Sequence, residues 1–166
     1  MLRGLCRYVS LTDAERRLFL RAFVCLGRID LALRISGVSA FVARRSTESA
    51  AGCRPVGAED LQRARQYARW IDIASHHHVV PAHCLHRSLA LHRWLRREGL
   101  PSDLRIGVQK ARGTLKAHAW VELGGEVVND SPAAVAAFTP LAAHLQVQVA
   151  SQPAGAVRQA RVEWQI

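Results

Sequence analysis

Apolar and polar residues in the first part of the chain recur at the spacing of a helix. Thr12 and Glu15 have the spacing of a capping box, in which each side chain bonds the backbone N–H of the other residue. The apolar positions that follow are three or four residues apart and therefore lie on one stripe of a helix. They are Leu18, Ala22, Cys25, Leu26, Ile29 and Leu33. We expect this helix to run to about Ile35 and to stop at Gly37, since glycine often closes helices.

Two more helices are expected further along the chain. The small and polar residues 44–57 predict a loop, and the apolar spacing within residues 58–74 predicts the second helix. The third helix is expected to start between Pro81 and Cys84 and to run to Glu98. Gly99 then fits the left-handed position that closes a helix, and Pro101 prevents its continuation.

After the third helix the apolar period changes to the alternation of a strand. Residues 104–108 and 115–123 alternate in this way, and residues 126–130 predict a third strand, joined to the second by Gly124 and Gly125. Helices come first and an antiparallel meander follows. The predicted fold class is therefore α+β, with N-terminal helices packed on a small antiparallel sheet.

The chain of 166 residues is long enough for one domain with its own core. We expect a helical portion at residues 1–75, the main motif-bearing part at 80–132 and a C-terminal portion at 133–166. The pattern weakens in the last portion. There we expect a helical turn, a short strand and an edge strand, at residues 132–138, 145–149 and 161–166.

Composition and charge narrow the function classes. Hydrophobic residues make up 49% of the chain and charged residues 22%, which is typical of a globular protein. We find neither a secretory signal nor an apolar run long enough for a transmembrane segment, so we expect a cytoplasmic protein whose four cysteines are free thiols. The net charge of +10 suits an acidic peptide or protein partner. The arginines are scattered and no basic strand is rich in aromatic residues, so nucleic acid is not expected as a partner.

Cys84 stands at the predicted start of the third helix, within "PAHCLHRSLALHRW". A thiolate is the reactive form of cysteine, and the unpaired N–H groups and dipole of a helix start favour negative charge. The same N–H groups can stabilise an oxyanion. A buried structural thiol is the plain alternative for a cysteine taken alone.

A cysteine nucleophile needs a base, and eight histidines are available. His118 differs from the others because it interrupts the apolar pattern of a predicted strand. It has an alanine on either side, and a tryptophan follows the second alanine. A two-residue turn at the two glycines would set His118 opposite Ser131, whereas a three-residue loop that includes Leu123 would set it opposite Asp130. Gly125 suits the second case, which would complete a triad of cysteine, histidine and aspartate.

These motifs resemble a known family. The stretch "CLHRSLALHRWLRREGLPSDLRIGV" followed by "AHAWVELGGEVVND" is similar to the transglutaminase-like, papain-related superfamily, and within it to the protease portion of lasso peptide biosynthesis B proteins. The resemblance is strongest over residues 80–132 and looser in the N-terminal helices. It implies that Cys84 is the nucleophile, His118 the base and Asp130 the residue that orients the base.

The resemblance also implies an activity and partners. Such proteases remove the leader peptide from a ribosomally made precursor before an ATP-dependent cyclase closes a macrolactam. Many relatives carry a winged-helix leader-recognition domain, and we see no such module in this sequence. We therefore expect a single-domain leader peptidase without cofactor or metal, which works with the precursor peptide and a separate leader-recognition protein, with the cyclase as a further candidate partner.

Three alternatives remain open from the sequence. The same triad could transfer an acyl group to an amine or serve another cysteine hydrolase. The chain could be a non-catalytic binding module with a structural cysteine. The histidine-rich run "HHHVVPAHCLH" could bind zinc, although its spacing matches no closed structural zinc pattern.

Overall fold

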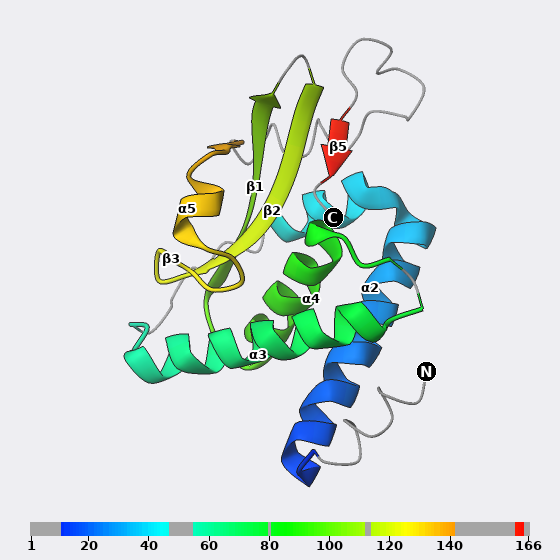
Figure 1. Ribbon diagram of the computed structural model, residues 1–166, viewed down its shortest axis with the longest axis vertical. Helices are drawn as coiled ribbons and strands as arrows, with labels where there is room; N and C mark the ends of the chain where they lie inside the picture. The colour runs from blue at the N-terminus through cyan, green and yellow to red at the C-terminus, as the bar shows by residue number, and fades with distance from the viewer. Residues whose placement is uncertain (1–10, 47–54, 80, 112–113, 142–161, 165–166) are drawn as a thin grey trace.

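The computed structural model describes residues 11–46, 55–79, 81–111, 114–141 and 162–164. Within these ranges three long helices come first and a sheet of five strands follows, so the α+β fold class is confirmed (Figure 1). No helix in these ranges is both long enough and apolar enough to cross a membrane.

The first helix among the described residues, α2, spans Asp13–Ser46. The predicted capping box begins it: Thr12 N donates to Glu15 Oε2 over 2.8 Å, and Glu15 N donates to Thr12 Oγ1 over 3.3 Å. The predicted end at Gly37 is wrong. Glycine inside a helix costs only about 1 kcal/mol relative to alanine, and no proline follows until Pro55, so the helix continues to Ser46.

The other two long helices agree more closely with the sequence pattern. The second, α3, spans Ala58–His77, and the third, α4, spans Cys84–Arg97. Gly99 has φ of 74°, and the N–H of Leu100 donates to the carbonyl of Leu95 over 2.9 Å. This is the predicted glycine closure of α4. Of the loop predicted at 44–57, only residues 44–46 and 55–57 are described. Residues 44–46 belong to α2 and not to a loop.

The core lies where α4 packs against α2, α3 and the sheet. Trp94 of α4 is buried and stacks on Tyr67 of α3, with ring centroids 4.7 Å apart. The guanidinium of Arg21 from α2 lies 4.6 Å from the Trp94 ring centroid and also pairs with Glu98. These contacts fix α4 between the two other helices and so fix the position of Cys84 at its first turn.

The sheet is built around one hairpin. Strand β1, Ser102–Ala111, pairs antiparallel with β2, Thr114–Leu123, over the full length of both. A two-residue strand β3, Glu126–Val127, pairs with the end of β2, and β4, Thr139–Pro140, pairs with β1. The short helix α5, Pro132–Val135, lies between these two strands in the chain.

The fifth strand lies on the edge of β2 that is opposite β1. Strand β5, Val162–Trp164, lies within the predicted edge strand but pairs parallel with β2, at residues 115–117. The strand predicted at 145–149 falls outside the described residues. Because β1 covers one edge of β2 throughout, β3 and β5 share the other edge. Between them, residues 118–121 of β2 have no strand partner on that side among the described residues.

Candidate active site

The turn after β2 differs from the prediction. Leu123 pairs with Glu126, so the loop has two residues and not three. Gly124 and Gly125 have φ of 60° and 84°, and two successive left-handed residues match the twist of a tight hairpin. The three-residue register is therefore wrong. The predicted third strand is wrong as well in its length, because β3 ends at Val127 rather than at Asp130.

Asp130 nevertheless reaches His118, by a path outside the strand ladder. The N–H of Val128 donates to the carbonyl of Val121 over 3.0 Å. The N–H of Val121 donates to Asn129 Oδ1 over 2.7 Å, so a side-chain oxygen replaces the carbonyl of a continuing strand. The chain then turns away, and Asp130 Oδ2 lies 2.6 Å from His118 Nε2.

Both carboxylate oxygens of Asp130 make hydrogen bonds. Oδ2 bonds the imidazole of His118, and Oδ1 accepts the N–H of Ser131 over 2.7 Å. Ser131 in turn caps α5, because its Oγ accepts the N–H of Ala134 over 3.1 Å. A carboxylate bound at both oxygens cannot rotate freely, so it fixes the orientation of the histidine ring.

The imidazole of His118 is enclosed on its strand. Its side chain is 7% exposed, with the Phe138 ring centroid at 5.1 Å and the Trp120 ring centroid at 6.2 Å. Gly107 pairs with His118 across the β1–β2 ladder, and a Cβ there would come within 2.8 Å of Trp120 and 2.9 Å of Phe138. The glycine therefore leaves the space in which these two rings cover the histidine.

His118 keeps one ring nitrogen available. Nε2 is occupied by Asp130, whereas Nδ1 is buried and has no hydrogen-bond partner among the described residues. A buried imidazole nitrogen without a partner is costly in a folded protein unless a group beside it can share a proton. The arrangement leaves Nδ1 for proton exchange with a reacting group.

Cys84 is the first residue of α4 and is 2% exposed. Burial raises the pKa of its thiol, because a thiolate loses solvation there. Hydrogen bonds from the backbone N–H groups of Ala119 and Leu85, and the charge of Arg87, act in the opposite direction. The negative charge of Asp130 adds to the increase. The Leu85 N–H at the helix start therefore lowers the pKa of the thiol, as expected, but desolvation outweighs it and the net shift is upward.

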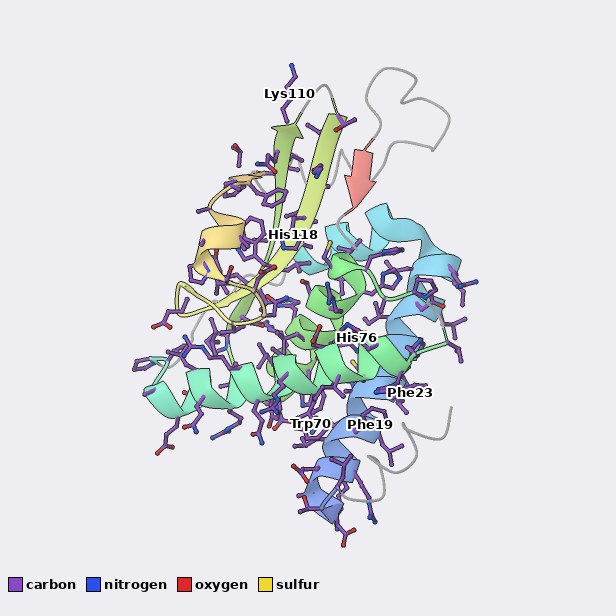
Figure 2. All side chains as sticks on the ribbon, viewed as in Figure 1. Phe19, Phe23, Trp70, His76, Lys110 and His118 are labelled. Atoms are coloured by element: carbon purple, nitrogen blue, oxygen red, sulfur yellow. The ribbon has the colours of Figure 1, made fainter. Side chains whose placement is uncertain are left out.

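A cavity of about 160 Å³ brings the three predicted residues together. Cys84, His118 and Asp130 all line it, and Figure 2 shows His118 on β2 beside the start of α4. The remaining lining residues are Ala68, Ile71, Asp72, Arg87, Leu91, Ala119 and Asn129. Asp72 and Arg87 form an ion pair of 2.9 Å on one wall. The space suits one small side chain or a few water molecules.

Other histidines of the described chain stand apart from this cavity. His92 is buried on α4 and its Nδ1 bonds Ser102 Oγ over 2.9 Å. His83 and His86 lie with ring centroids 5.8 Å apart, and His76 Nδ1 lies 2.8 Å from the Asp72 carbonyl. No group of three or more histidine, cysteine or carboxylate side chains in the described ranges could hold a metal ion.

Sequence reasoning missed Ser88 and Asn129. Ser88 Oγ donates to the Ala119 carbonyl over 2.8 Å and accepts Asn129 Nδ2 over 2.9 Å. A signal for Ser88 existed: it follows Cys84 by four residues and so lies on the same helix face, amid apolar residues. Asn129 gave no comparable signal, since its role depends on where β3 ends.

Comparisons with known proteins agree with this architecture. A model of the transglutaminase-like superfamily matches residues 24–143. The microcin J25-processing protein McjB of Escherichia coli is 37% identical over 62 residues, which is 37% of this chain. The aligned part spans only 29% of McjB. No solved structure matches the chain.

Proposed function

Because the chain belongs to the transglutaminase-like superfamily, we propose that it is a cysteine peptidase that removes the leader from a lasso peptide precursor. The observation that carries the proposal is the shared cavity. Cys84 lines it together with His118, whose Nε2 is bound to Asp130 and whose Nδ1 has no hydrogen-bond partner in the described part of the chain. Similarity to McjB, a processing protein for microcin J25, supports a peptide precursor as the substrate.

The first step is a proton transfer from Cys84 to Nδ1 of His118. Burial raises the pKa of the thiol, so the thiolate forms as a pair with the imidazolium rather than alone. Asp130 Oδ2 accepts a hydrogen bond from Nε2–H and stabilises the charged ring. The role of Asp130 is thus to make His118 a stronger base in a poorly solvated site.

Bond cleavage follows in two stages. The thiolate attacks the carbonyl of the last leader residue, and N–H groups at the start of α4 are available to the resulting oxyanion. His118 returns its proton to the leaving amine of the core peptide, so a thioester remains on Cys84. Water, deprotonated by His118, then releases the leader as a carboxylic acid.

The proposed peptidase acts with partners. The precursor's leader is the substrate, a separate leader-recognition protein presents it, and an ATP-dependent cyclase uses the freed core amine. The alignment with McjB covers less than a third of that protein, so these partners are part of the proposal.

Acyl transfer is the second candidate, and the superfamily match favours it as much as hydrolysis. Both reactions share the thioester on Cys84 and differ only in the acceptor. Adding a primary amine during turnover separates them. A peptidase yields the free leader acid as the main product, whereas an acyltransferase yields the amide.

The cleavage assay tests the proposal. A candidate precursor is incubated with the protein and its leader-recognition partner, and the products are identified by mass spectrometry. We expect one cut that is lost in Cys84→Ala. Cys25→Ala is the matched control, because Cys25 is a described free thiol on α2 whose Sγ bonds the Ala90 carbonyl over 3.6 Å. Equal cleavage by wild type and Cys84→Ala would refute the assigned nucleophile.

A further inference from the structure

We propose that Ser88 is a positioning residue whose one hydroxyl holds together the three segments that carry Cys84, His118 and Asp130. The inference rests on the proposed function for the roles of those three residues. The hydrogen bonds themselves are independent of it. Ser88 has no exposed surface and lies one helical turn after Cys84.

The hydroxyl uses both its donor and its acceptor capacity. Its proton goes to the carbonyl of Ala119, the neighbour of His118 on β2, over 2.8 Å. Its oxygen accepts Nδ2 of Asn129, the neighbour of Asp130, over 2.9 Å. One buried side chain on α4 is thus bonded to the residue beside the proposed base and to the residue beside its orienting carboxylate.

The direction of these bonds is determined by Asn129. Its Oδ1 accepts the N–H of Val121, so its Nδ2 must point to Ser88 as a donor. Ser88 then has to donate onward, and the Ala119 carbonyl is the acceptor it reaches. The chain of bonds runs from β2 through the loop to α4 and back to β2, and a closed path of this kind restricts relative movement of all three segments.

Ala119 explains why this path matters for the thiol. Its carbonyl accepts from Ser88, and its N–H bonds Cys84 and counters the effect of burial on the thiol pKa. Both groups point to the edge of β2 that β3 and β5 leave uncovered. Cys84 and Ser88 are one turn apart on α4, so the two bonds together fasten the helix start to this edge.

Only a small hydroxyl residue fits this role. Alanine at position 88 would leave the Ala119 carbonyl and the Asn129 amide without their buried partner. Threonine would add a methyl group at a fully buried position in the packed core. The substitution to test is therefore Ser88→Ala, which removes the oxygen and adds no atoms.

The experiment compares Ser88→Ala with Ser102→Ala. Ser102 is also buried, 3% exposed, and its Oγ also makes a buried side-chain bond, to His92 Nδ1 over 2.9 Å. Both variants should lose some thermal stability. Only Ser88→Ala should lower kcat for precursor cleavage, by about ten- to a hundredfold with KM little changed, because the reacting groups lose alignment.

A second readout needs no substrate. The rate of Cys84 alkylation by iodoacetamide is measured against pH, and the modified residue is identified by mass spectrometry. Ser88→Ala should move the profile to higher pH, because the Ala119 N–H no longer holds its place against the thiol. Ser102→Ala should leave the profile where the wild type has it.

Asn129→Ala keeps the test usable if Ser88→Ala fails to fold. It breaks the same path from the loop and should shift the alkylation profile in the same direction. In the double variant the loss in kcat should be smaller than the two single losses combined, since both act through one network.

Unchanged kcat and an unchanged alkylation profile in a folded variant would overturn the inference, as would equal effects in Ser102→Ala. If wild type cuts no precursor, the proposed function fails, while the alkylation profile still decides the role of Ser88.

Discussion

At the scale of single residues, burial and nearby positive groups act in opposite directions on the pKa of the Cys84 thiol. Cys84 is almost fully enclosed, which raises the pKa of its thiol, and the Ala119 and Leu85 N–H groups and the Arg87 guanidinium only partly offset this. A thiol with a raised pKa shares its cavity with an imidazole nitrogen that has no partner among the described residues, which suits a nucleophile that is activated only as its proton moves. It also protects the thiol from reagents in the absence of substrate.

Removing the Arg87 charge tests this balance. Its guanidinium lowers the pKa of Cys84, so Arg87→Ala should raise that pKa further. Because alkylation requires the thiolate, the pH–rate profile of the variant should lie at higher pH than that of the wild type. At any pH below the thiol pKa, the variant should be alkylated more slowly than the wild type. Arg105→Ala is the control, since Arg105 also forms an ion pair of 2.9 Å, with Glu122 on the neighbouring strand. A profile that stays in place in Arg87→Ala would contradict the electrostatic account.

At the scale of secondary-structure elements, the strong patterns were predictable and the pairing was not. The α4 helix has an apolar stripe, a glycine closure and a following proline, so its bounds and the place of Cys84 could be predicted. The β1–β2 hairpin shows clear alternation and was also predicted. Two adjacent glycines permit either loop length, however, and the length of β3 depends on Asn129 replacing a strand carbonyl, which no local pattern indicates.

The correct pairing of His118 with Asp130 was therefore predicted from a wrong register. The prediction relied on two residues facing each other across a ladder, whereas the structure brings them together where the ladder has ended. The same limit applies to α2, where Gly37 is a possible stop that tertiary packing and the absence of proline override. A local signal such as a glycine favours the end of a helix or strand at that residue, and the surrounding structure decides whether the helix or strand ends there.

The packing of β1 against the site gives a prediction at this scale. In Gly107→Ala the new methyl group would meet Trp120 and Phe138 at distances that real contacts do not allow, so the rings over His118 must move. We expect a loss of about 1–3 kcal/mol in the free energy of unfolding, measured in urea, together with slower cleavage. Gly27→Ala is the control, because its Cβ would meet only the His78 side chain at 3.5 Å, an ordinary contact. Wild-type stability in Gly107→Ala would show that the rings are not held as described.

At the scale of the whole molecule, the site lies where three helices meet the sheet, beside the edge of β2 that carries β3 and β5 (Figure 1). The helices fix α4, the sheet fixes β2, and the loop after β3 brings Asp130. Each element alone would leave one of the three proposed catalytic groups without its partner. Residues far apart in the sequence thus form one cavity, and the family match spans the elements that build it, residues 24–143.

The central claim is that Cys84 carries the leader as a thioester, and intact-protein mass spectrometry after an acid quench tests it most directly. During turnover of the precursor, the wild type should gain the mass of the leader less one water, on the peptide that contains Cys84. The core peptide should appear free in the same sample, and Asp130→Asn should accumulate less adduct, because the orientation of His118 is lost. Continued cleavage by Cys84→Ala at the same bond, or an adduct that maps to another residue, would contradict the account.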